Sequence, residues 1–155
     1  MKPEIFSEIG PIEKVYVYSP GEEHNLVLPS DVQPFLVQEN NIVINKDFLL
    51  FDDIIDLKNA RDQHETFMDI INFYNKDSCI NIRKHFLAIL ENENISTNYP
   101  LINLMYPRDI AAIIGNQIYL TSSSSIVRKT ENFLSESFFT NQPEYKECEI
   151  IDFKK

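Results

Sequence analysis

The sequence contains no tryptophan, and its 155 residues hold only three glycines, three histidines and two cysteines. Because the glycines are isolated, at Gly10, Gly21 and Gly115, the chain has none of the glycine-rich loops that bind phosphate groups. The cysteines and histidines show neither the Cys-x-x-Cys nor the His-x-x-x-His spacing of common metal sites, so we expect no metal and no other cofactor. Two isolated cysteines are typical of reduced thiols inside a cell.

Positive charge and long apolar runs are also scarce. The chain has 14 basic residues against 24 acidic ones, a formal net charge of −10. Nucleic-acid binding requires a concentrated basic surface, so we expect no nucleic-acid partner. The longest apolar runs, such as residues 110–114, are too short to cross a bilayer, and neither a basic amphipathic stretch nor a signal peptide is evident. We therefore expect a cytoplasmic protein with no membrane contact.

Apolar residues are plentiful. Hydrophobic residues make up 43% of the chain and aromatic residues 12%, which suits a single domain, residues 1–155, with a buried core. The pattern predicts strands at Lys14–Tyr18, at Asn41–Asn45, at 111–114 and 117–120, and at Cys148–Phe153. Gly115-Asn116 favours a type II′ hairpin turn between the third and fourth of these. Pro29 and Pro34 interrupt the region before the second strand.

Three helices are predicted, from about Ile54 to Tyr74, from about Asn81 to Leu90, and from Ile126 to Phe139. In the first helix, apolar residues recur at steps of three and four, and these are expected to face inward: Ile54, Leu57, Ala60, His64, Phe67, Ile71 and Tyr74. Asp52 or Asp53 is expected to cap this helix, and Ser125 the third. Strands and helices alternate, which predicts a mixed α/β domain.

The segment Asn103-Leu-Met-Tyr-Pro-Arg-Asp109, with Arg128 further along, combines groups that can hold a small zwitterion. Asp109 can accept paired hydrogen bonds from a guanidinium, and Tyr106 can stack on the same planar cation. Arg128 can bind a carboxylate, and Asn103 can donate to or accept from either end. Residue types alone favour a simpler interpretation, in which Arg108 and Asp109 form a local ion pair and Arg128 is solvated.

A series of further sequence patterns favours the zwitterion site over the simple ion pair. In chain order they are Ser7-Glu-Ile-Gly leading to Pro20-Gly21, Leu49-Leu-Phe-Asp-Asp53 before Ala60-Arg-x-x-His64, Ile102–Asp109, Ile114-Gly-Asn-Gln-Ile-Tyr-Leu120, and Arg128-x-x-Glu131. Each is weak alone, but the ordered series resembles the arginine deiminase branch of the guanidino-group-modifying, amidinotransferase-like superfamily. The resemblance implies a partial α/β-propeller (pentein-like), with about two ββαβ-type modules and mixed sheets.

The resemblance also implies a substrate site. Asp109 falls on the family's acid that grips the substrate guanidinium, and Asn103, Tyr106 and Arg128 fall on other substrate-contacting positions. Arginine or another guanidino compound is the implied ligand. Two departures put the loop geometry in question.

These departures are Pro107, where the family has threonine, and Gln117, where it has glycine.

Catalysis in the family resembles thiol chemistry, in which a cysteine attacks the guanidinium carbon and a histidine moves the proton. Those residues and their partner acids lie in later segments of the family, and this chain ends at Lys155 before them. Cys79 and Cys148 have no visible histidine partner. The three histidines are His24 in a polar loop, His64 on the inward helix stripe, and His85 on a helix surface. We assign no catalytic residue.

Three hypotheses remain open. The first is a truncated arginine-deiminase-like protein that keeps part of a guanidino site and is no enzyme as an isolated chain. The second is a non-catalytic interaction or regulatory module that pairs with itself or another chain. The third is the N-terminal piece of a split or longer deiminase that hydrolyses arginine to citrulline and ammonia. An open part of a propeller leaves apolar faces uncovered, so a homo-oligomer or a completing chain is expected.

Overall fold

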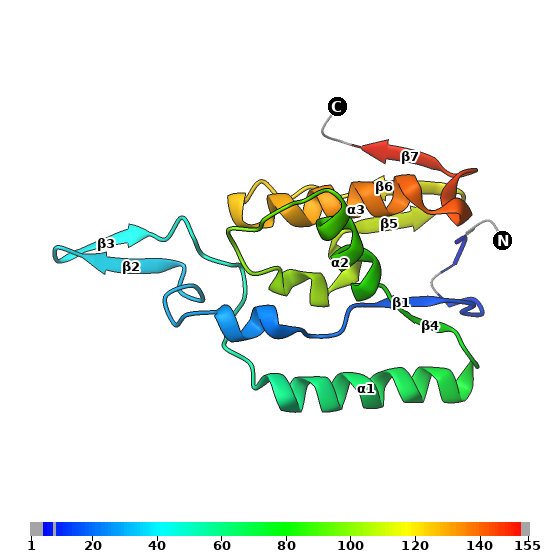
Figure 1. Cartoon of the computed structure of the whole chain (residues 1–155), viewed down its shortest axis with the longest axis horizontal. Helices are drawn as coiled ribbons and strands as arrows, with labels where there is room; N and C mark the ends of the chain where they lie inside the picture. Colours follow the sequence, from blue (N-terminus) through cyan, green and yellow to red (C-terminus); the bar gives the residue numbers. More distant parts are fainter. Residues whose placement is uncertain (1–4, 8, 153–155) are drawn as a thin grey trace.

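The computed structural model describes residues 5–7 and 9–152, which form three small sheets and three α-helices. In Figure 1, α2 and α3 lie above the β1–β4 pair, α1 runs below it, and the β2–β3 hairpin projects to the left of the body. The helices are α1 at Leu57–Tyr74, α2 at Arg83–Asn92 and α3 at Lys129–Asn141. The arrangement is mixed α/β, and none of the sheets is closed.

The sheets differ in their strand pairing. β1 (Val15–Val17) pairs in parallel with β4 (Cys79–Asn81), and β2 (Phe35–Gln38) pairs antiparallel with β3 (Asn41–Ile44). In the third sheet β5 (Ala111–Ile114) pairs antiparallel with β6 (Gln117–Leu120), which pairs in parallel with β7 (Glu149–Asp152). The order β5–β6–α3–β7 is strand–strand–helix–strand. The partial α/β-propeller of about two modules stays a prediction.

An aromatic cluster forms the centre of the main core. Phe138 of α3 lies 5.4 Å from Phe86 of α2, ring centroid to centroid, and 6.0 Å from both Tyr16 and Tyr145. Such pairs contribute roughly 0.5–1.5 kcal/mol each beyond the burial of their surface. Because these rings come from β1, both helices and the segment before β7, they join the two halves of the chain.

A second, smaller cluster lies beside the first. Its buried members are Val27, Leu49, Phe51, Ile102 and Val127. It packs the chain between the short 3-10 helix η1 (Glu22–Leu26) and α1 against η2 (Ile102–Met105) and η4 (Ile126–Arg128). The segments that carry Asn103 and Arg128 therefore share one apolar support.

The helices exist where the sequence predicts them, with different ends and a different exposed face. α1 is capped by Asp56, whose side chain accepts a hydrogen bond from the Asn59 amide at 2.9 Å, so the predicted caps Asp52 and Asp53 are wrong. Of the predicted inward stripe, Phe67 and Tyr74 remain 50% and 83% exposed. The apolar residues of α1 recur with the helical period, but the rest of the described chain buries only some of them.

The start of α3 and the start of β7 differ from their predicted positions. Residues 126–128 form the 3-10 helix η4 before α3 starts, and Ser125 precedes it without a side-chain capping bond. β7 covers Glu149–Asp152 and so begins one residue after the predicted Cys148, while the predicted Phe153 lies outside the described residues. The β5–β6 hairpin is confirmed: Gly115 has φ 56° while Asn116 has no positive φ, the pattern of a type II′ turn.

The β2 strand was not predicted from the sequence, because Pro34 was treated as an interruption of the whole region. Pro34 lies just before the strand, where its missing N–H costs nothing. Glu39 and Asn40 make the turn, both with positive φ (48° and 65°), as a two-residue type I′ turn requires. The register pairs Phe35 with Ile44 and Val37 with Ile42.

A buried ion pair ties η1 to α2. The Arg83 guanidinium donates to both carboxylate oxygens of Glu23, at 2.5 and 2.8 Å, and lies 5.3 Å from the Tyr18 ring centroid. The side chains are 20% and 13% exposed, so the pair is largely shielded from water. Gly21 lies directly beneath the guanidinium, and a Cβ there would overlap it.

We predict that Gly21→Ala lowers the free energy of unfolding by about 1–3 kcal/mol, because the methyl group displaces Arg83 from a shielded Glu23. Urea denaturation followed by circular dichroism measures this. Gly10→Ala is the matched control: a Cβ there meets its nearest atom at 3.7 Å, so its stability should stay within about 0.5 kcal/mol of wild type. Equal effects of the two substitutions contradict the packing argument.

Candidate functional site

Arg128 lies between two carboxylates. Its Nε donates to Glu131 Oε2 at 2.5 Å, and its Nη1 lies 3.6 Å from Asp109 Oδ2. The Arg128 and Glu131 side chains are 14% and 2% exposed, whereas the Asp109 side chain is 50% exposed. Arg128 is thus held firmly by Glu131 and loosely by Asp109, whose carboxylate faces solvent in part.

Asp109 is placed by a short helix and a hairpin. It ends η3 (Pro107–Asp109), where its amide donates to the Tyr106 carbonyl at 2.9 Å and its carbonyl accepts from the Thr121 hydroxyl. Pro107 occupies the first position of η3, where a backbone N–H would lack a helical partner in any case. The substitution of threonine by proline is therefore compatible with this loop.

The other departure is also compatible with the local geometry. Gln117 is the first residue of β6 and lies outside the Gly115-Asn116 turn, and its side chain donates to Glu149 at 2.7 Å. The simple alternative for Asp109, an ion pair with Arg108, is not formed within the described residues. The acid pairs with Arg128 instead.

Asn103 and Tyr106 are held by the second core cluster. Asn103 is 4% exposed, and its amide donates to the Leu49 carbonyl at 2.7 Å. The Tyr106 side chain is half exposed, and its ring lies 6.1 Å from the ring of Phe51. The structure thus joins Asp109 and Arg128 directly, and places Asn103 and Tyr106 on the neighbouring η2–η3 segment.

Glu131 is the site residue that sequence reasoning did not assign. Burial raises the pKa of its carboxyl, and the hydrogen bond and charge of Arg128 and the backbone of Asn103 oppose that rise only in part. Its Oε1 is buried without a hydrogen bond of normal geometry. The spacing Arg128-x-x-Glu131 could have predicted this contact, since residues three apart lie on one face of a helix.

The surroundings of Cys79, His24 and His64 do not activate these side chains for catalysis. Burial raises the pKa of the Cys79 thiol, the opposite of what a nucleophile needs. His24 is 4% exposed, with its ring 5.8 Å from Phe51, so the prediction of a polar loop was wrong. His64 lies within 3.3 Å of the Ser19 hydroxyl through Nδ1, and burial lowers the pKa of its ring. His85 is exposed, as predicted.

Two cavities, of about 500 and 310 Å³, are formed by other residues. Neither of these two cavities is lined by Asn103, Tyr106, Asp109 or Arg128. Among residues 5–7 and 9–152, no three His, Cys, Asp or Glu side chains are grouped as a metal site requires. None of the helices described is long and apolar enough to cross a membrane.

The fold and the site define a mixed α/β domain whose polar centre is a guanidinium between two carboxylates. No family model matches the chain. It is similar to proteins named arginine deiminase from Borreliella burgdorferi (strain ZS7) and Borrelia garinii subsp. bavariensis, each 27% identical over 215 aligned positions that cover 97% of this chain and 49% of the relative. The corresponding protein of Borreliella afzelii (strain PKo) is 27% identical over 92% of this chain and 47% of its own length.

The similarity is low in identity but extends over nearly the whole chain, which supports an arginine-deiminase-like relationship. This chain spans about half the length of the curated relatives that it matches. The 215 aligned positions exceed its 155 residues by 60, so at least that many are gaps in this chain. The relatives therefore carry additional residues within the aligned region itself.

We predict that Glu131→Gln changes how stability depends on pH. Because the folded-state pKa of Glu131 is raised above its ordinary 4.5, the stabilisation from its protonated form is complete below pH 4.5 and is lost as pH rises through the raised value. Glutamine cannot ionise, so the variant should gain stability relative to wild type as pH rises from about 4 to 7.

Urea denaturation at several pH values measures this difference. Glu65→Gln, on the exposed face of α1, is the matched control and should differ from wild type by a constant amount over the same range. If the Glu131 and Glu65 variants give parallel curves, the burial of Glu131 does not control its ionisation.

Proposed function

We propose that this chain is an arginine-deiminase-like binding protein, which holds a guanidino compound such as arginine without transforming it. The observation that carries the proposal is the contact between Asp109 and Arg128, because it sets an exposed acid beside a fixed guanidinium. The acid suits the cationic head of arginine, and Arg128 suits its α-carboxylate. The similarity to proteins named arginine deiminase supports the choice of ligand.

The distances suggest how the site accepts a ligand. The 3.6 Å separation of Arg128 Nη1 from Asp109 Oδ2 is longer than a charge-assisted hydrogen bond, which is about 2.7–2.9 Å. Asp109 can therefore turn to a ligand cation at little cost. Arg128 keeps its bond to Glu131 and retains N–H groups for a ligand carboxylate. Tyr106 offers a half-exposed ring to a planar cation, and Asn103 supports the segment from below.

Chemistry on a bound guanidinium requires an activated thiol and a proton carrier. The described surroundings of Cys79 raise the pKa of its thiol, and the histidines serve packing and hydrogen bonding. We therefore propose that hydrolysis of arginine to citrulline and ammonia, if this chain takes part in it, requires groups supplied by a further polypeptide segment.

We predict that arginine binds to the purified chain and that Asp109→Asn weakens binding at least tenfold, roughly 1.4 kcal/mol. Arg128→Gln should weaken the binding of arginine but not that of agmatine, its analogue without a carboxylate. Isothermal titration calorimetry measures both. Asp69→Asn, an exposed acid on α1, is the matched control and should bind arginine as wild type does.

Two results would contradict the proposal. Tight arginine binding that survives Asp109→Asn would remove the assigned role of that acid. Rapid citrulline formation by the wild-type chain, lost in Cys79→Ala or Cys148→Ala, would show that the chain is a complete catalyst.

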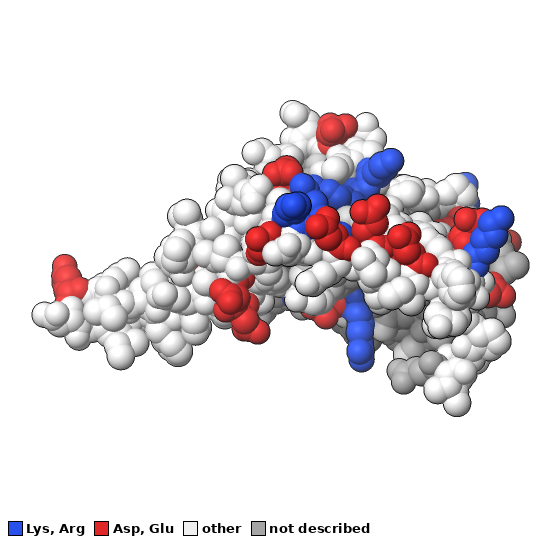
Figure 2. Space-filling model, turned by 90° about the horizontal axis from the view of Figure 1, so that it is seen from below, with Lys and Arg blue, Asp and Glu red and all other residues white. Residues whose placement is uncertain are grey.

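A second function, as an interaction module, is favoured by the β2–β3 hairpin. Phe35, Val37, Ile42 and Ile44 share one face of it, by the alternation of strand residues and by the register, and are 58–77% exposed. Isolated two-stranded ribbons are marginally stable in water. Figure 2 shows the projecting hairpin almost free of charged side chains. We propose that this face pairs with a second copy of the chain. The chain has a net charge of −10, so two copies repel each other least where they meet through an uncharged face.

We predict that the chain self-associates and that the double variant Val37→Lys with Ile42→Glu is monomeric. The two new charges face each other across the hairpin, so the hairpin keeps a cross-strand pair while its apolar face is lost. The control, Gln38→Lys with Asn41→Glu, alters the adjacent polar pair and should associate as wild type does. Sedimentation velocity over a range of concentrations distinguishes them, and a wild-type chain that stays monomeric throughout contradicts the proposal.

A further inference from the structure

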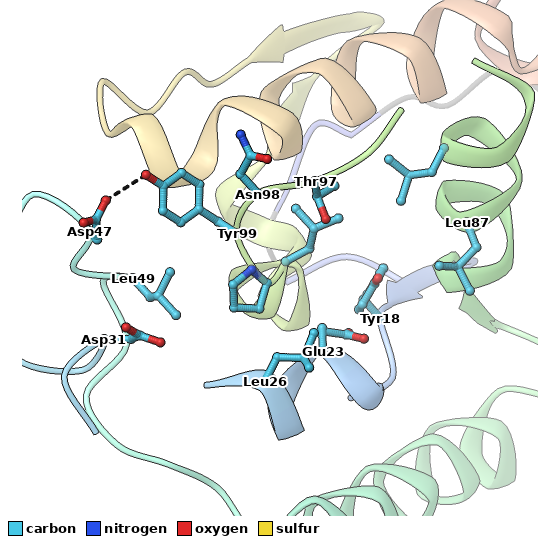
Figure 3. A pocket seen from close by; sticks show the side chains of 13 residues that line it. Tyr18, Glu23, Leu26, Asp31, Asp47, Leu49, Leu87, Thr97, Asn98 and Tyr99 are labelled. Atoms are coloured by element: carbon cyan, nitrogen blue, oxygen red, sulfur yellow. Dashed lines mark hydrogen bonds between the residues drawn. The ribbon is translucent and has the colours of Figure 1, made fainter. Parts of the chain in front are cut away.

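A cavity of about 500 Å³ lies between η1, α2 and the chain at residues 97–101, apart from the Asp109 site. Its volume falls within the range of small-molecule pockets. Figure 3 shows Asp31 and Asp47 on one side of it, Leu87 on the opposite side, and Glu23 and Tyr18 along its lower edge. No motif that we recognised in the sequence accounts for this cavity.

The lining is acidic and includes no Lys, Arg or His. Glu23 is neutralised by its bidentate pair with Arg83. Asp31 and Asp47 have no ion pair within the described chain. Asp31 accepts from the Leu28 amide at 2.8 Å, and Asp47 accepts from the Tyr99 hydroxyl at 2.7 Å. Within the described residues, both acids therefore have only neutral hydrogen-bond donors as partners at the cavity.

The rest of the lining is mainly apolar and aromatic, with two polar side chains, Thr97 and Asn98. The apolar and aromatic part consists of Leu26, Leu49, Leu87, Leu90, Pro100 and Leu101 with the rings of Tyr18 and Tyr99. The bond from Tyr99 to Asp47 ties the ring of the tyrosine to one of the two unpaired acids. Aromatic faces attract organic cations, and leucine walls bind an attached hydrocarbon group.

We propose that this cavity binds an organic cation with an apolar body and no anionic group, such as an arylalkyl or alkyl amine. Asp31 and Asp47 attract the ammonium, and the leucine wall receives the hydrocarbon. An amino acid is excluded, since its carboxylate would meet two acids and no cation. This selectivity is the reverse of that of the Asp109 site, where Arg128 receives the carboxylate. The inference stands without the proposed arginine site.

The test uses 2-phenylethylamine, with 2-phenylethanol and phenylalanine as neutral and zwitterionic counterparts, added to the ¹⁵N-labelled full chain and followed by NMR titration. The amine should bind saturably and shift amides of residues 97–101 and α2. The alcohol should bind at least tenfold more weakly, and phenylalanine should not bind there.

Charge and volume are tested separately. Asp47→Asn keeps an acceptor for the Tyr99 hydroxyl, and both this variant and Asp31→Asn should weaken amine binding at least threefold, with a larger loss in the double variant. Leu87→Trp, which fills the cavity from its half-exposed side, should abolish binding. Asp69→Asn is the charge control and should bind as wild type does.

The two sites are distinguished by crossing the variants. Asp109→Asn should leave amine binding unchanged, and the Asp31/Asp47 double variant should leave arginine binding unchanged. Equal affinity for the amine and the alcohol, an unchanged double variant, or no saturable binding of the amine overturns the proposal, whatever the outcome for arginine.

Discussion

The ion pair between Arg83 and Glu23 connects the segments that carry the two core clusters. Arg83 begins α2, which packs in the main core, while Glu23 belongs to η1, whose next residue, His24, packs on Phe51 of the second cluster. Phe51 in turn contacts Tyr106 of the segment that carries Asp109. A loss of this ion pair therefore loosens η1, and with it the apolar support beneath the candidate site. The absence of a side chain at Gly21 permits this connection.

The two proposed sites use carboxylates in different electrostatic settings. At Asp109 the acid lies beside the Arg128 guanidinium, so a ligand with both charges can replace one contact by another. At Asp31 and Asp47 the acids have only neutral hydrogen-bond donors within the described residues, so the proposed cationic ligand would supply the counter-charge. Glu131 illustrates a third setting, in which burial disfavours the charge and a neighbouring arginine partly restores it. The same functional group thus serves binding, attraction and positioning, according to exposure and partner.

Local patterns were sufficient to predict α1, α2 and the β5–β6 hairpin, because helical periodicity and a Gly-Asn turn depend on near neighbours in the chain. They did not predict β2, since Pro34 restricts only its own position and not the strand that follows. The pairing of Asp109 with Arg128, rather than with the adjacent Arg108, depends on packing of η4 against η2, which a single sequence does not encode visibly. His24 and Glu131 were misjudged or overlooked for the same reason: their burial results from contacts between distant segments.

The uncharged hairpin also affects the colloidal behaviour of the chain. Residues 35–44 hold a single charge, Glu39 at the turn, and no other described strand pairs with either edge of the hairpin, a combination that favours association between copies. The remainder of the molecule carries nearly all of the net charge of −10, whose mutual repulsion keeps copies apart. At 1 M salt this repulsion is screened within about 3 Å, while the apolar attraction between hairpins persists. We therefore expect association of copies through the hairpin to strengthen as ionic strength rises and to weaken at low salt.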